Sequence, residues 1–197
     1  GWKVLNHVPF SIPLSWFYVG FSCYLLASVI VQWLELGSQT AWRLGLGVWF
    51  LTVWDLVLDP AMAHHSLKIK FWVWDESGPY FGMPVKNFIG WSITGLIFMA
   101  LARALWRRDI DAAAFPPLFP LAIYASNMAF AMVLSGGVRL WIPIVLAVVL
   151  GLVPAAYALQ AKRDNDLHGS PPAPKPSAPP SPAAPTAPSW QPSSISR

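Results

Sequence analysis

Two carboxylates, Asp55 and Asp59, stand four residues apart in an apolar stretch of this sequence, WDLVLDP. Residues at this spacing lie on one face of a helix, about one turn apart, so the two side chains can act as a pair. An ionisable side chain at membrane depth is costly, and such acids usually face a bundle interior and serve a function. In a low-dielectric site, two neighbouring carboxylates are not expected to be ionised together. The pair could therefore act as a general acid without a cofactor.

Asp59 and the residues that follow it allow more than one interpretation. Asp59 precedes Pro60, so it could simply end the helix at the membrane interface, whereas Asp55 lies about one turn deeper. His64 and His65 follow, either as interfacial histidines with solvent access or as a weak proton relay to the acids. The sequence lacks the repeated histidine clusters of membrane di-iron oxygenases, so we expect neither a metal site nor a cofactor.

A loop dense in aromatic residues is expected over residues 60–86, before the chain re-enters the membrane. Aromatic faces attract a developing carbocation and can stack on a polyene. An interfacial aromatic belt with re-entrant turns would have a similar composition, and residue types alone do not separate the two interpretations. The candidate substrate-binding residues of this region are Trp72, Trp74, Tyr80, Phe81, Asn87 and Trp91.

The composition places the chain among polytopic membrane proteins. Of its 197 residues, 55% are hydrophobic and only 11% are charged, and 12 are Trp. The net charge of +4 comes from Lys and Arg at the ends of apolar runs, so a nucleic acid partner is not expected. Cys23 is the single cysteine, which excludes a disulfide framework within the chain.

We therefore predict an all-α, polytopic integral membrane helix bundle with about five transmembrane helices. An interfacial segment should cover residues 1–13 and the transmembrane domain residues 14–162. The second span should end at Pro60. Residues 163–197 are rich in Pro, Ala and Ser and should form a disordered tail. The first residue is Gly, so we expect a fragment that lacks upstream helices. The predicted spans are 14–36, 42–58, 87–106, 117–134 and 140–159.

Four motifs in the chain, IPLSWF, WDLVLDP, WVWDESGPYFGMPVKNFIGW and PPLFPLAIYASNMAF, resemble the bacterial carotenoid biosynthesis membrane family. That family includes the C-1′,2′ hydratases of acyclic carotenoid ends, and the resemblance covers most of residues 9–160. It implies a helical, multi-pass enzyme of the bacterial inner membrane, with more spans than this chain has. It also implies a carotenoid lipid substrate and other carotenoid-pathway enzymes as partners. The family loop often reads Tyr-Tyr-Gly, whereas this chain has Tyr80-Phe81-Gly82.

Together these observations predict a cofactor-independent hydratase, a lyase that adds water to the C-1′,2′ double bond of an acyclic (ψ) end group, as in γ-carotene or lycopene. Protonation of the alkene would give a tertiary cation, and water would then add to it. From the chemistry alone, Asp55 is predicted to supply the proton and Asp59 to hold or regenerate it. The aromatic residues would stabilise the cation, and Asn87 or Tyr80 would orient water.

Two other functions remain open at this stage. Intramembrane prenyltransferases also carry a DxxxD pair, which binds a magnesium diphosphate. They need a second acidic motif, for which Asp75/Glu76 and Asp109/Asp111 are the nearest but poor candidates. The chain could also be a non-catalytic membrane scaffold whose Pro-rich tail binds partners.

Overall fold

The computed structural model describes residues 3–4, 8–9, 11–68, 70–106, 116 and 118–168. Five of its helical segments are long and apolar enough to cross a membrane: Leu14–Trp33, Gln39–Met62, Val85–Leu105, Phe119–Gly137 and Trp141–Gln160. A span of about 20 apolar residues matches the thickness of the hydrocarbon layer. The predicted all-α fold with five spans is confirmed, and the chain is an integral membrane protein.

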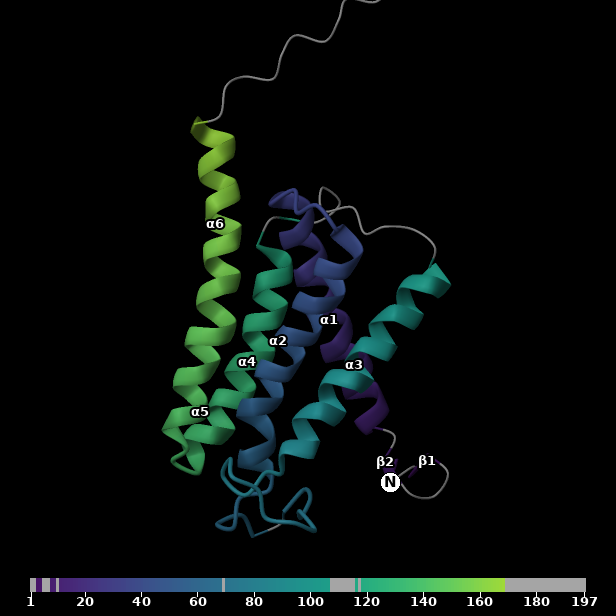
Figure 1. The fold of residues 1–197 in the computed structure, drawn as a ribbon. Coiled ribbons are helices and arrows are strands. Elements are labelled where there is room, and N and C mark those ends of the chain that lie inside the picture. Colours follow the sequence, from purple (N-terminus) through teal and green to yellow (C-terminus); the bar gives the residue numbers. More distant parts are fainter. Residues whose placement is uncertain are drawn as a thin grey trace, which may run out of the picture.

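The helices follow one another along the chain as α1 (Ser11–Trp33), α2 (Gln39–Met62), α3 (Val85–Trp106), α4 (Phe119–Gly137), α5 (Trp141–Leu146), the π-helical segment η2 (Ala147–Leu152) and α6 (Val153–His168). Figure 1 shows α5, η2 and α6 as one long helix. Before α1, the two-residue strands β1 (Lys3–Val4) and β2 (Val8–Pro9) pair antiparallel.

Helix α2 lies at the centre of the bundle. It packs against α1, α3, α4 and the α5–η2 part of the last span, while α3 crosses the bundle obliquely at its edge (Figure 1). The loop between α2 and α3 lies at the same end of the bundle as the start of α1 (Figure 1). This topology brings the acids of α2, the first residues of α3 and the first turns of α1 to one end of the molecule.

Two glycines allow α2 and α3 to approach closely. A Cβ at Gly47 would lie 2.7 Å from Sδ of Met99, and one at Gly95 would lie 2.6 Å from Cδ2 of Leu51. Small residues at helix contacts bring backbones together in membranes, where packing and polar contacts drive association. Thr52 Oγ1 and Ser92 Oγ, 3.1 Å apart, add a hydrogen bond between the same two helices. These contacts fix the position of α3 relative to the acid-bearing helix.

The end of α2 differs from the prediction, because Pro60 does not stop the helix. The helix continues to Met62, with Pro60 inside its last turn. A proline has no N–H, so it cannot bond to the carbonyl four residues earlier, which here belongs to Leu56. The hydroxyl of Tyr80 donates to that carbonyl at 3.1 Å and replaces the missing bond. The proline is thereby tolerated, and Asp59 stays in the helix rather than at its end.

The other helix boundaries shift by a few residues from those predicted. α1 begins at Ser11, inside the expected interfacial segment 1–13, and the loop between α2 and α3 is shorter than the expected 60–86. α6 continues to His168, so the helix extends past the predicted start of the tail at residue 163. The rest of the predicted tail, residues 169–197, lies outside the described residues.

Candidate active site

Asp55 and Asp59 lie side by side in the protein interior, as their spacing predicts. Their exposed fractions are 0% and 2%, so Asp59 is not an interfacial cap. The side-chain amide of Asn87, on α3, donates to Oδ2 of Asp55 at 3.3 Å and to Oδ2 of Asp59 at 3.0 Å. The two carboxyl groups therefore converge on one nitrogen, with a donor from the neighbouring helix between them.

The two acids have unequal surroundings. Oδ2 of Asp59 also accepts a hydrogen bond from Nε1 of Trp91, at 3.3 Å, whereas among the described residues Asn87 is the one N–H donor to Asp55. The two carboxyl side chains also hydrogen-bond to each other. Oδ1 of each acid is buried and has no hydrogen-bond partner among the described residues. A buried carboxyl oxygen normally has a partner, so these two atoms are suited to carry or receive a proton.

A cavity of about 790 Å³ adjoins the acid pair, and we call it the substrate cavity. Asp59 lies in its wall, but Asp55 does not. Most of the wall is aromatic or aliphatic, as in pockets that bind apolar ligands. Its residues are Ser15, Trp16, Tyr18, Val19, Trp54, Leu58, Asp59, Met62, Phe71, Trp72, Trp74, Asn87, Trp91, Asn127 and Phe130.

Three tryptophans from three helices meet beside Asp59. The rings of Trp16 (α1) and Trp91 (α3) are stacked with centroids 3.9 Å apart, and Trp54 (α2) meets Trp91 edge-on at 5.8 Å. The indole nitrogen of Trp91 holds Asp59, so this ring is fixed relative to the acid. Indole faces attract cations, and this cluster places indole rings next to a buried carboxyl group.

The candidate residues of the loop divide into two groups. Trp72 and Trp74 line the substrate cavity, and their Nε1 atoms are buried without a hydrogen-bond partner among the described residues. Tyr80 and Phe81 are not in the cavity wall. Burial, with a smaller contribution from the charge of Asp55, raises the pKa of Tyr80 to about 12. Its hydroxyl therefore remains a donor at neutral pH, and it is engaged with the Leu56 carbonyl.

Phe81 stands in a tight turn behind Tyr80. Phe81 and Gly82 have φ angles of 49° and 86°, and the amide of Met83 donates to the carbonyl of Tyr80 at 2.8 Å, as in a type I′ hairpin turn. Such a φ is unusual for a bulky residue. The Phe81 ring is 43% exposed and packs edge-on against Tyr80. Phe81 thus lies in the turn and outside the wall of the substrate cavity, and its contact with substrate stays a prediction.

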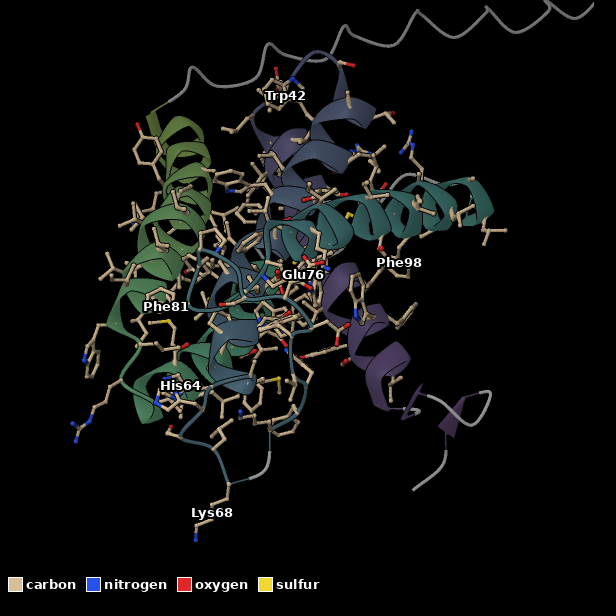
Figure 2. All side chains as sticks on the ribbon, turned by 60° about the horizontal axis from the view of Figure 1, so that its bottom comes forward. Trp42, His64, Lys68, Glu76, Phe81 and Phe98 are labelled. Atoms are coloured by element: carbon tan, nitrogen blue, oxygen red, sulfur yellow. The ribbon has the colours of Figure 1, made fainter. Side chains whose placement is uncertain are left out.

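The two histidines lie in the loop that follows α2, and Figure 2 shows His64 at this end of the bundle. Nδ1 of His64 is 2.8 Å from Oγ of Ser66, and its ring lies 4.2 Å from that of His65. Partial burial and the neighbouring His65 lower the pKa of His64. Among the described residues no hydrogen bond joins either histidine to the acid pair, so the structure offers no direct relay.

Within the part of the chain that the structure describes, no second acidic motif of the kind that a prenyltransferase needs lies at the site. Asp75 is exposed, and Glu76 pairs with Lys86 at 3.0 Å on the surface. Asp109 and Asp111 lie outside the described residues. Within the described part of the chain, no three His, Cys, Asp or Glu side chains form a group that could hold a metal.

The structure adds cavity residues that the sequence analysis did not select. Asn127 of α4 bonds to Oη of Tyr18 at 3.2 Å, and its backbone carbonyl accepts from Nε1 of Trp54 at 3.2 Å. A polar side chain in an apolar span was the available signal for Asn127. Trp16 was part of the IPLSWF motif but was not among the candidate substrate-binding residues. No sequence signal indicated that it stacks on Trp91, because the contact joins residues 75 positions apart.

The fold and the site define an integral membrane protein with a buried acid pair beside an aromatic cavity. A family model described as "Carotenoid biosynthesis protein" matches residues 1–154, so the chain belongs to the carotenoid biosynthesis protein family and the predicted resemblance is confirmed. The chain is similar to bisanhydrobacterioruberin hydratase of Haloarcula japonica, with 28% identity over 160 residues, 77% of this chain and 50% of that protein. It thus spans about half the length of this curated relative. No solved structure matches it.

Proposed function

We propose that this protein hydrates the C-1′,2′ double bond of an acyclic carotenoid end group, such as that of γ-carotene or lycopene. The observation that carries the proposal is the position of the acid pair, with Asp59 in the wall of a large, apolar, tryptophan-lined cavity inside a membrane protein and Asp55 behind it. The similarity to a carotenoid hydratase supports the same reaction class. The motif resemblance further suggests the bacterial inner membrane as its location.

Asp59 is the better candidate for the proton donor, because it faces the substrate cavity and Asp55 lies behind it. This reverses the roles expected from the sequence. A proton moves from the Asp59 carboxyl to C-2′, the π bond breaks, and a tertiary cation forms at C-1′. Asp55, held on the same amide of Asn87, is the neighbour with which Asp59 shares and exchanges protons.

The surroundings of Asp59 favour the cation over the neutral alkene. Loss of the proton leaves a negatively charged pair, and the faces of Trp16, Trp54 and Trp91 add their own attraction for positive charge. Water forms the new bond to C-1′, and the proton released from its oxygen returns to the acid pair. The atoms balance as one alkene plus one water, and the pair ends the cycle as it began.

The cavity is suited to one end of a long apolar molecule. Two residues of its wall, Tyr18 on α1 and Phe130 on α4, are 50% and 54% exposed on helices that span the membrane. A carotenoid dissolved in the bilayer could therefore enter sideways between α1 and α4, and its polyene could remain in the lipid. Asn127 and Tyr18, hydrogen-bonded to each other, lie at this side of the cavity.

The arrangement fits a prenyltransferase less well. A magnesium site is built from oxygen ligands and usually includes several waters and substrate phosphates. Here the point on which both carboxyl groups converge is taken by an N–H donor, the amide of Asn87. Among the described residues, the wall of the cavity contains no Lys or Arg that could bind a diphosphate.

The direct test is expression of the gene that encodes this chain in a host that makes lycopene or γ-carotene. The expected result is a carotenoid heavier by one water, with a tertiary alcohol at C-1′, detected by mass spectrometry and NMR. Unchanged pigment in membranes that contain the protein would refute the assignment to these substrates. A prenylated product would instead favour the transferase.

A further inference from the structure

We propose that the water consumed in this reaction reaches the site by its own route, through a second pocket on the loop side. The inference rests on the proposed function and adds to it the binding site of the second substrate. This loop-side pocket has a volume of about 280 Å³ and is lined by Trp16, Trp74, Pro84, Lys86, Asn87, Gly90 and Trp91. Its size is sufficient for several water molecules.

The loop-side pocket and the substrate cavity share a wall. Trp16, Trp74, Asn87 and Trp91 line both spaces. Two of these residues, Asn87 and Trp91, donate directly to Asp59, so the shared wall includes the groups that hold the acid. Molecules in the two spaces can therefore approach the reacting carbon from different sides.

The loop-side pocket has an exposed charged residue in its wall, unlike the lipid-facing side of the substrate cavity. Lys86 lines the pocket and pairs with Glu76, and the two side chains are 61% and 68% exposed. Charged side chains this exposed must lie in water or among headgroups, not in hydrocarbon. Figure 2 shows Glu76 on the loop that covers this end of the bundle. Water therefore has access to this pocket without crossing the membrane interior.

One residue of the shared wall carries an unpaired donor. Nε1 of Trp74 is buried without a hydrogen-bond partner among the described residues, and Trp74 belongs to both walls. A buried indole N–H usually finds a partner, and an ordered water is a common one. We expect this N–H to bind a water when water enters at the shared wall.

Separate routes for the carotenoid and for water would meet two opposing requirements of the reaction. The proton must be transferred in a dry environment, because water around Asp59 would weaken its interaction with the alkene and the cation. One or a few waters must nevertheless be close to C-1′ when the cation forms. Stacked Trp16 and Trp91, together with Asn87, would limit water to the amount that the loop-side pocket delivers.

The experiment places larger side chains in the loop-side pocket by substituting Gly90, a residue of α3 that lines it. A Cβ at Gly90 would meet no atom within 4 Å, so Gly90→Ala, Gly90→Leu and Gly90→Phe form a graded series without overlap at the backbone. Replacing a helical glycine also favours the helix. Gly45→Leu, on α2, is the matched control, because Gly45 is equally open and lines neither space.

The variants are compared in isolated membranes that contain unlabelled carotenoid and are suspended in D₂O buffer, at equal amounts of protein in the membrane. In Gly90→Leu we expect alcohol formation to fall about tenfold, with a further fall in Gly90→Phe. Protonation should continue, so unhydrated carotenoid should gain deuterium or appear as a double-bond isomer, because the cation then loses a proton instead of adding water. Gly45→Leu should form the alcohol as the unaltered protein does.

Three results would overturn the inference. Normal alcohol formation in Gly90→Phe would show that water does not need this pocket. Loss of both alcohol and deuterium uptake in Gly90→Leu would show that the pocket serves protonation or carotenoid binding instead. If the unaltered protein forms no alcohol and introduces no deuterium, the proposed function itself fails, and the water route fails with it.

Discussion

Replacement of Asp59 by Asn is the most direct perturbation of the proposed mechanism. Asn has the same shape, and its side-chain oxygen can still accept from Asn87 and Trp91, the donors that hold Oδ2 of Asp59 at 3.0 and 3.3 Å. It removes a costly ionisable group from the membrane interior and creates no cavity. We therefore expect Asp59→Asn to insert and accumulate normally, while it has no acidic proton to give to the alkene.

The expected loss of reaction rate in Asp59→Asn follows from the position of Asp59 at the cavity wall. A positioned general acid contributes about 10²–10⁴-fold to a rate. At about 1.4 kcal/mol for each factor of ten, this corresponds to roughly 3–5 kcal/mol of activation free energy. Asp55→Asn should have a smaller effect, of about 10–100-fold, because Asp55 has no surface in the cavity and acts through its neighbour.

The assay measures the hydrated carotenoid formed per amount of membrane-inserted protein, for both variants and the unaltered chain, in a host that makes lycopene or γ-carotene. Asp59→Glu serves as a partial rescue, since it restores the acid at a shifted position. If Asp59→Asn retained activity within about tenfold of the unaltered protein, Asp59 would not be the general acid. If Asp55→Asn were the more damaging change, the sequence-based assignment of Asp55 as the donor would be restored.

Three further predictions test other parts of the structure. Tyr80→Phe removes the donor to the carbonyl that Pro60 leaves free, so thermal unfolding in detergent should show a destabilisation of about 1–3 kcal/mol, and an unchanged midpoint would contradict this. Membranes washed with EDTA should still hydrate the carotenoid, whereas a loss of turnover that Mg²⁺ restores would turn the acid pair into metal ligands and favour the prenyltransferase. Truncation after His168 should leave activity and membrane abundance unchanged, because the sequence that follows is rich in Pro, Ala and Ser, and a loss of activity at normal abundance would give the tail a function.

The local sequence was sufficient to predict the membrane-spanning helices and the shared helical face of the acid pair. Long apolar runs predict membrane spans because every backbone polar group must be satisfied within the segment. The four-residue spacing of Asp55 and Asp59 fixes them on one helical face whatever surrounds the helix. The tryptophans near these acids were also evident, and the three selected as candidates, Trp72, Trp74 and Trp91, do line the substrate cavity.

Tertiary structure decided which acid faces the substrate cavity and what holds it. Asp59 is in the wall and Asp55 behind it because α3 and α1 pack on particular sides of α2, at contacts set by glycines such as Gly95. Asn87 donates to both acids, which no local pattern could show, because its partners are 32 and 28 residues away. The prediction that Pro60 ends α2 was wrong for the same kind of reason. A proline costs a helix one backbone bond, and only the folded chain brings the distant hydroxyl of Tyr80 to the free carbonyl.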